Sequence, residues 1–255
     1  MSTGESGKTR PPEATGEPGA TERPGTSADI VDVLVHRLDL GSSELHALEG
    51  LLTPDERARA GRIRQDDRRA GFIVGRGRLR VLLGEVLRCR PDAVPIVDGP
   101  GEKPRLDEAT QARVRFSVAH SAQLVLCALA MDHDIGVDVE LVDDAVAWEA
   151  IAARVLTAAE RAALGALHPG SRRDAFFDCW TRKEAVIKAT GEGLRRPLTS
   201  FAVSVEPHRA AMLSCDPTLG TPASWVLAPV SVPLGYRAAV AVRGRRTPVS
   251  LRLWP

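Results

Sequence analysis

The chain has 255 residues, which is enough for one large domain or two modest ones. Hydrophobic residues make up 44% and charged residues 26%, with 34 Lys and Arg against 33 Asp and Glu, which excludes global disorder and a charge excess suited to coating nucleic acid. The longest apolar run, Leu124 to Met131, is far shorter than the roughly 20 residues that span a bilayer, so no contact with a membrane is expected. Four scattered cysteines without a C-x-x-C pair favour reduced thiols in a cytoplasmic protein.

Residues 1–28 differ in composition from the rest of the chain. They contain no aromatic residue and no Val, Ile or Leu, so nothing in them offsets the entropy cost of ordering the backbone. They also lack the apolar segment of a secretory signal. We therefore expect a disordered tail, with the folded part beginning near Asp29.

The remainder contains an internal repeat. The segment Leu52–Ala58, LTPDERA, is echoed 104 residues later by Leu156–Ala162, LTAAERA, and Arg68–Phe72 is echoed at the same offset by Arg172–Phe176. Coincidence between two Arg- and Ala-rich helices is the alternative explanation. Two matches at one offset favour a duplicated unit, with residues 29–132 as an N-terminal half and residues 133–255 as a C-terminal half.

Each copy has the same predicted elements. Thr53 and Thr157 are predicted helix N-caps, because Glu56 and Glu160 follow at the spacing of a capping box. A short alternating stretch precedes each helical region, and a β-rich run follows it, at residues 114–130 and 225–242. The sequence predicts an α/β (α+β) fold of two similar sheet-plus-helix halves, with a cleft between them that is suited to a ligand.

Two acidic residues share one face of a predicted strand. In the run I-G-V-D-V-E-L-V at residues 135–142, alternation places Asp138 and Glu140 on the face opposite the apolar residues. An ordinary edge strand with its acids in water would show the same pattern.

A second group of charged residues lies on a predicted helix. In W-T-R-K-E-A-V-I-K, Trp180, Glu184 and Lys188 recur at i, i+4 and i+8 and share one face. A solvated salt bridge is the simpler interpretation, and it would contribute only a few tenths of a kcal/mol. The indole on the same stripe favours a partly buried face instead.

Lysine is rare in this chain, and its positions are therefore informative. It occurs only at Lys8, Lys103, Lys183 and Lys188, while arginine supplies the other 30 basic residues. An ammonium can give up a proton and a guanidinium effectively cannot, so the retained lysines point to lysine chemistry, with chance as the alternative. Lys103 lies in a G-E-K-P turn, and a further motif, F-S-V-A-H-S, ends at Ser121.

The four motifs in this order resemble the 4′-phosphopantetheinyl transferases of the surfactin-synthetase-activating type. The resemblance covers both copies of the repeat, from Leu34 to about Val242. It implies a pseudo-dimer within one chain, with the active site in the cleft between the halves, and a monomer as the natural oligomeric state. It also implies transfer of the phosphopantetheine arm from coenzyme A to a serine of an apo acyl or peptidyl carrier protein, with Mg²⁺ as cofactor and release of adenosine 3′,5′-bisphosphate.

The resemblance assigns roles to individual residues. It implies that Mg²⁺ is held by Asp138, Glu140 and Glu184, that Glu184 or a metal-bound water accepts the serine proton, and that Lys188 contacts the phosphates and protonates the leaving group. Coenzyme A contacts are implied for Lys103, Pro104 and His120, with Lys188. Two departures from the family pattern stand out, Ala119 in place of a common serine and Glu56 near a position that is often basic.

The first half carries a local excess of positive charge. Between Arg57 and Arg90 there are 11 arginines against three acidic residues, which suits a multiply charged nucleotide or an acidic carrier protein. Arg59 and the i, i+4 pair Arg76 and Arg80 are the candidate phosphate contacts. Nucleic-acid binding is the alternative, although the stretch contains only one aromatic residue and we expect no nucleic-acid partner. A homologue that binds coenzyme A without transferring the arm is a further alternative.

Overall fold

The computed structural model describes residues 30–99, 103–110, 112–207, 209–244 and 250–254. The predicted tail lies outside the described residues. The helices are α1 (Ser42–Gly50), α2 (Pro54–Arg62), α3 (Asp66–Leu87), α4 (Trp148–Val155), α5 (Ala158–Ala166) and α6 (Arg172–Thr190). The strands are β1 (Ile30–Arg37), β2 (Ile96–Asp98), β3 (Pro104–Leu106), β4 (Val114–Ser121), β5 (Leu124–Met131), β6 (Ile135–Leu141), β7 (Phe201–Val203), β8 (Met212–Cys215), β9 (Trp225–Pro229), β10 (Tyr236–Arg243) and β11 (Ser250–Trp254).

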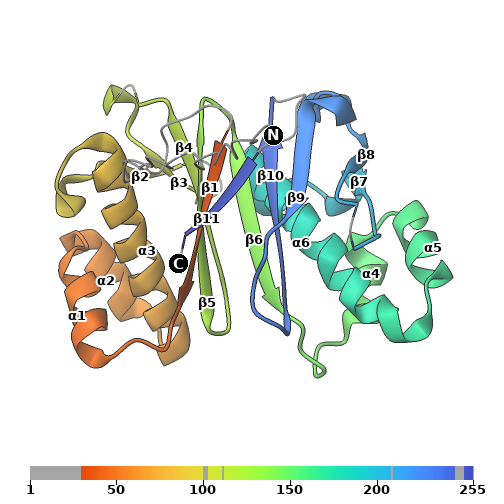
Figure 1. The fold of residues 1–255 in the computed structure, drawn as a ribbon, viewed down its shortest axis with the longest axis horizontal. Coiled ribbons are helices and arrows are strands. Elements are labelled where there is room, and N and C mark those ends of the chain that lie inside the picture. Colours follow the sequence, from red (N-terminus) through yellow and green to blue (C-terminus); the bar gives the residue numbers. More distant parts are fainter. Residues whose placement is uncertain (1–29, 100–102, 111, 208, 245–249, 255) are drawn as a thin grey trace, which may run out of the picture.

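Two sheets form the centre of the molecule, and helices cover their outer sides. One sheet has the order β11-β1-β5-β4 and the other the order β6-β10-β9, with α1–α3 on the outer side of the first and α4–α6 on the outer side of the second (Figure 1). Both central sheets are therefore enclosed between helices and the opposite sheet. The mixed α and β content confirms the predicted fold class.

The same order of elements occurs twice along the chain. One strand, three helices and four strands run from β1 to β5 and again from β6 to β10. In each copy the first strand pairs antiparallel with the last, which pairs antiparallel with the one before it. Thr53 and Thr157 cap α2 and α5 through complete capping boxes with Glu56 and Glu160, as predicted.

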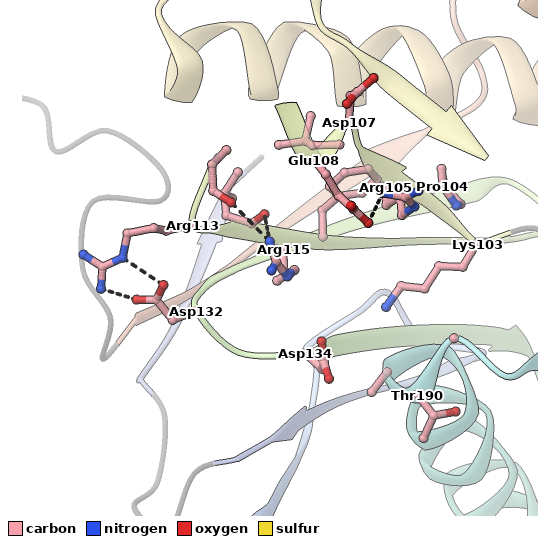
Figure 2. A pocket seen from close by; sticks show the side chains of 16 residues that line it. Lys103, Pro104, Arg105, Asp107, Glu108, Arg113, Arg115, Asp132, Asp134 and Thr190 are labelled. Atoms are coloured by element: carbon pink, nitrogen blue, oxygen red, sulfur yellow. Dashed lines mark hydrogen bonds and ion pairs between the residues drawn. The ribbon is translucent and has the colours of Figure 1, made fainter. Parts of the chain in front are cut away.

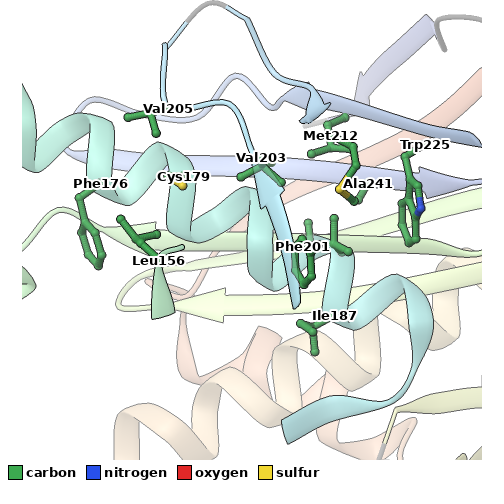
Figure 3. Close-up of a cluster of buried hydrophobic side chains, with 14 of the residues drawn as sticks. Leu156, Phe176, Cys179, Ile187, Phe201, Val203, Val205, Met212, Trp225 and Ala241 are labelled. Atoms are coloured by element: carbon green, nitrogen blue, oxygen red, sulfur yellow. The ribbon is translucent and has the colours of Figure 1, made fainter. Parts of the chain in front are cut away.

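Three apolar clusters fill the spaces between these layers. One lies between α1–α3 and the first sheet, a second lies between the two sheets, and a third surrounds α6. Alternation along β5 divides its residues between two of them, since Val125, Cys127 and Leu129 pack toward the helices and Leu124 and Leu126 toward the second sheet. Figure 3 shows the third cluster, in which Phe176, Cys179 and Ile187 of α6 lie against side chains from β7 to β10.

The strand β11 adds a feature that the repeat does not predict. It comes from the end of the chain but pairs in parallel with β1 in the first sheet. Arg252 Nε lies 2.5 Å from Oδ1 of Asp32, which is buried. The C-terminal strand is thus attached to the N-terminal half. None of the described helices is long and apolar enough to cross a membrane.

Candidate active site

The close approach of α6 to β6 builds the centre of the site. Gly136 allows this approach, because a Cβ at that position would lie 1.9 Å from the carbonyl oxygen of Ala185 and 2.5 Å from the backbone nitrogen of Ala189. A glycine inside a strand commonly marks a place where another backbone comes near. The polar face of β6 is therefore held directly against the α6 turn that carries Glu184 and Lys188.

Asp138 and Lys188 form the main ion pair of the site. Lys188 Nζ donates to Asp138 Oδ1 at 2.7 Å, and the second oxygen, Oδ2, is buried and has no hydrogen-bond partner in the structure. Burial raises the pKa of Asp138, whereas Lys188 acts in the opposite direction. An orphaned carboxylate oxygen beside a cation marks a place where a further positive ligand would be stabilised.

The Glu140 carboxylate is held by side chains from β4 and from α6. Ser121 Oγ, at the end of β4, donates to Glu140 Oε2 at 3.0 Å, and Trp180 Nε1, on α6, donates to Oε1 at 3.4 Å. Burial and the charge of Asp138 raise the pKa of Glu140, while these two hydrogen bonds lower it. Its carboxylate is fixed in direction before any ligand binds.

Glu184 completes the group of three carboxylates. Burial, followed by the charge of Asp138, raises its pKa to about 6, with a smaller contribution from Glu140. Together with Lys188 and Lys103 it lines a cavity of about 510 Å³, whose wall also includes apolar side chains. The structure thus brings together all four residues that the resemblance assigned to metal binding and catalysis. A carboxyl whose pKa is near neutrality is suited to accept and release a proton.

Lys103 lies between two cavities. Its Nζ donates to the carbonyl of Ile135 at 2.8 Å, and burial lowers its pKa to about 8. Lys103 and Pro104 line both the 510 Å³ cavity and a second cavity of about 540 Å³, which is shown in Figure 2. There the Lys103 side chain extends toward Asp134 and the end of α6, with Arg105 and Arg115 nearby. Both predicted contacts from the G-E-K-P turn are at the site, whereas Gly101 and Glu102 lie outside the described residues.

His120 and Arg59 line another cavity, of about 1210 Å³. Burial lowers the pKa of His120, and the charges of Lys188 and Arg68 lower it further. The Arg59 guanidinium lies over the Phe72 ring, 5.4 Å from its centroid. The predicted contacts His120 and Arg59 therefore share one cavity, which is lined by both acidic and basic side chains.

The structure does not bring Arg80 to these cavities. Arg80 is 1% exposed and donates through Nε and Nη2 to both carboxylate oxygens of Glu56, at 2.8 Å each. Its Nη1 donates to backbone carbonyls, including that of Val94. All of its donor nitrogens face protein acceptors, so we remove Arg80 from the candidate phosphate contacts. Arg76 is mostly buried and lies 3.4 Å from the same Glu56 carboxylate.

These pairs also bear on the nucleic-acid alternative. Arg78 pairs with Glu44, and Arg69 pairs with Asp66. Together with Arg76, Arg80 and Arg90, five of the eleven arginines of the Arg57–Arg90 stretch therefore pair with a carboxylate within the fold.

Lys183 also differs from the expectation raised by its rarity. It is 0% exposed, and its Nζ donates to both carboxylate oxygens of Glu160, at 2.7 and 2.8 Å, and to the carbonyl of Phe201. Lys183 belongs to the core of the second half and not to the site. Of the lysines in the described residues, Lys103 and Lys188 are the two that reach the cavities.

The three carboxylates are the candidate ligands for a metal ion. The charge of Asp138 raises the pKa of both Glu140 and Glu184, and Oδ2 of Asp138 is buried without a hydrogen-bond partner in the structure. Carboxylate oxygens are the donors that Mg²⁺ prefers. As the side chains stand, however, the described residues contain no group of three or more His, Cys, Asp or Glu arranged to hold a metal ion. The donor set fits Mg²⁺ in kind, and a carboxylate would have to turn for the three to share one ion.

Comparison with known proteins identifies the family. Residues 134–241 match the family model of the 4′-phosphopantetheinyl transferase superfamily. The 4′-phosphopantetheinyl transferase HetI of Nostoc sp. is 34% identical over 208 residues, which cover 81% of this chain and 85% of HetI. The chain belongs to the 4′-phosphopantetheinyl transferase family. It is an enzyme, and the predicted family membership is confirmed.

Two further 4′-phosphopantetheinyl transferases match shorter regions. AcpT of Escherichia coli K12 is 30% identical over 127 residues, or 50% of this chain and 60% of AcpT. The transferase gsp of Aneurinibacillus migulanus is 31% identical over 132 residues, or 48% of this chain and 52% of gsp. The family model covers β6 and α6, the elements that hold the carboxylates and Lys188.

Sequence reasoning assigned no role to Gly136 or Ser121. Gly136 could have been noticed as a glycine inside a predicted strand, where a close backbone neighbour is the usual reason. Ser121 ends the F-S-V-A-H-S motif, but its partner Glu140 lies 19 residues away on another sheet. Local periodicity carries no information about such a contact.

Proposed function

We propose that this chain is a transferase of the surfactin-synthetase-activating type, which moves the 4′-phosphopantetheine arm of coenzyme A to a serine of apo acyl or peptidyl carrier proteins in a Mg²⁺-dependent reaction. The observation that carries the proposal is the convergence of Asp138, Glu184 and Lys188 where α6 meets β6, with Lys188 Nζ 2.7 Å from Asp138. Family membership supports the same activity.

Asp138, Glu140 and Glu184 would hold the Mg²⁺ ion. When bound, the ion would neutralise charge on the pyrophosphate oxygens of coenzyme A. The unpartnered Oδ2 of Asp138 supports this assignment. Lys188 already donates to Oδ1 of Asp138. If the ion is bound at Oδ2, the Lys188 ammonium would therefore lie beside the same phosphates as the ion.

Two residues would move protons at this site, Glu184 and Lys188. The serine oxygen of the carrier forms a bond to the β-phosphorus of coenzyme A, and the bond from that phosphorus to the bridging oxygen breaks. Glu184, whose pKa is about 6, is largely ionised at neutral pH and can accept the serine proton. Lys188 can donate a proton to the departing phosphate of adenosine 3′,5′-bisphosphate.

The nucleotide would be bound mainly by the first half. Lys103 and Pro104 on one side, and His120 and Arg59 on the other, line the cavities that flank the carboxylates. We propose that the two halves form a pseudo-dimer with the active site between them and that the chain acts as a monomer. Arg76 would add positive charge beside the His120 cavity, because its guanidinium lies over the ring of Phe72, which lines that cavity.

Intact-mass analysis of several apo carriers, incubated with the protein, coenzyme A and Mg²⁺, tests the function. We expect the mass of one arm on the carrier and an equal amount of released adenosine 3′,5′-bisphosphate. Soluble, folded protein that modifies none of the carriers would refute the proposal. Asp138→Ala should abolish turnover and keep the circular dichroism spectrum, and retained activity would contradict the metal assignment.

A further inference from the structure

The two central sheets are joined at β4 and β6 by side chains and not by a backbone ladder. β4 is the edge of the first sheet and β6 the edge of the second, and the ladders found among the described strands do not include a β4–β6 pair. Ser117 Oγ accepts from the backbone N–H of Val137, and Ser121 Oγ accepts from that of Leu141, both at 3.1 Å. We call this pair of contacts the serine seam.

The serine seam has a regular register. Ser117 and Ser121 are four residues apart on β4, and Val137 and Leu141 are four residues apart on β6, so the two strands run in parallel across the gap. Asp138 and Glu140 lie between the two anchored positions of β6. The seam therefore fixes the segment of β6 that carries both carboxylates.

The two serines differ in how their hydroxyls are used and in the cavity that they line, since Ser117 lines the 510 Å³ cavity. Ser121 uses its hydroxyl twice, since the oxygen accepts from Leu141 and the proton goes to Glu140 Oε2 at 3.0 Å. The contact from Ser117 to β6 is to the backbone alone. Ser121 also follows His120 directly and lines the same cavity. It thus connects the proposed nucleotide cavity of the first half with a carboxylate of the second half.

We propose that Ser121 is a positioning residue, which holds the Glu140 carboxylate across the seam in the orientation required for metal binding. This inference rests on the proposed function for the identity of the ligand, a divalent cation. Partners that orient a metal ligand typically change metal affinity or activity by about 10- to 100-fold when they are removed. Ser117 fixes the register of β6 and provides a matched control on the same strand.

The test is direct metal binding in the absence of a carrier protein. Mn²⁺ is titrated into the protein with coenzyme A present, and free Mn²⁺ is measured by electron paramagnetic resonance. We expect Ser121→Ala to raise the Mn²⁺ dissociation constant by about tenfold. Ser117→Ala loses one seam bond of the same length and should leave that constant within about twofold, although both variants should melt at lower temperature.

A second pair of variants keeps the test decisive if Ser121→Ala does not fold. Ser121→Thr retains the hydroxyl, and Ser121→Val introduces a side chain shaped like threonine without the hydroxyl. Ser121→Thr should bind Mn²⁺ like the wild type, and Ser121→Val should bind it about tenfold more weakly. Equal dissociation constants for Ser121→Thr and Ser121→Val, or a loss in Ser117→Ala equal to that in Ser121→Ala, would overturn the proposal. Failure of the proposed function is recognised separately, as unmodified carriers in the wild-type assay.

Discussion

Glu56 and Arg80 in the first half form a buried ion pair that Glu160 and Lys183 repeat in the second. In both copies the glutamate of the capping box, on the second helix, accepts from a basic residue on the third helix. The distances are 2.8 Å for Glu56 to Arg80 and 2.7 Å for Glu160 to Lys183. Two residues that looked like candidates for chemistry are thus part of the framework that orients α3 and α6.

Removing Lys183 should destabilise the protein strongly. Lys183→Met leaves the Glu160 charge buried without its partner, which costs about 3–5 kcal/mol of unfolding free energy. The double variant Glu160→Gln with Lys183→Met should recover much of that loss, because neither group is then charged. Urea denaturation followed by circular dichroism measures both. A loss below about 1 kcal/mol in the single variant would show that the pair does not have this role.

The contrast between Arg59 and Arg80 gives a second prediction. Arg80→Ala should lower the unfolding free energy by several kcal/mol, about 3 or more, because Glu56 loses its buried partner. Arg59→Ala should change stability by about 0.5 kcal/mol or less and raise the KM for coenzyme A severalfold. Denaturation and steady-state kinetics on the same preparations separate the two effects. If Arg80→Ala instead raised the KM for coenzyme A without a loss of stability, and Arg59→Ala lowered stability without a change in KM, Arg80 would again be a candidate ligand contact.

Gly136 provides a test of the contact between β6 and α6. An alanine there would place its Cβ 1.9 Å from the Ala185 carbonyl oxygen, so α6 would have to move away from Asp138. We expect Gly136→Ala to lose at least about tenfold in kcat and to be less stable by 1–3 kcal/mol, roughly the cost of overpacking. Gly165→Ala is the control, because nothing lies within 4 Å of that Cβ and helix propensity alone predicts a gain of about 0.5–1 kcal/mol. An unchanged kcat in Gly136→Ala would show that catalysis does not require the close packing of α6 against β6.

The lowered pKa of Lys103 predicts a pH dependence. Lys103 is charged below its pKa of about 8 and neutral above it, and phosphate binding favours the charged form. The kcat/KM for coenzyme A should therefore fall as pH rises through about 8. Lys103→Arg stays charged over this range and should lack that fall. Identical profiles for the two proteins would remove Lys103 from the nucleotide contacts.

The local parts of the structure could be predicted from the sequence. The capping boxes at Thr53 and Thr157 follow from a glutamate three residues later, and Asp138 and Glu140 share a face because strand side chains alternate. The i, i+4 relation of Glu184 and Lys188 follows in the same way from helix geometry.

Long-range pairing could not be predicted in this way. Arg80 and Lys183 have partners 24 and 23 residues away, and neither periodicity nor composition shows that a charge will be buried. The repeat did contain a usable signal, since each copy has a glutamate on its second helix and a basic residue at nearly the same place on its third. The pairing of β11 with β1 and the contact from Ser121 to Glu140 depend on how distant segments meet in space.

The central claim is that the carboxylates of β6 and α6 support metal-dependent transfer of the arm. The most direct measurement is the intact mass of an apo carrier after incubation with coenzyme A and the wild-type protein in Mg²⁺, with wild type in EDTA and Asp138→Asn in Mg²⁺ as parallel reactions. We predict the mass gain of one arm, located on a serine, in the first reaction alone. An equal gain in EDTA or with Asp138→Asn would contradict the account.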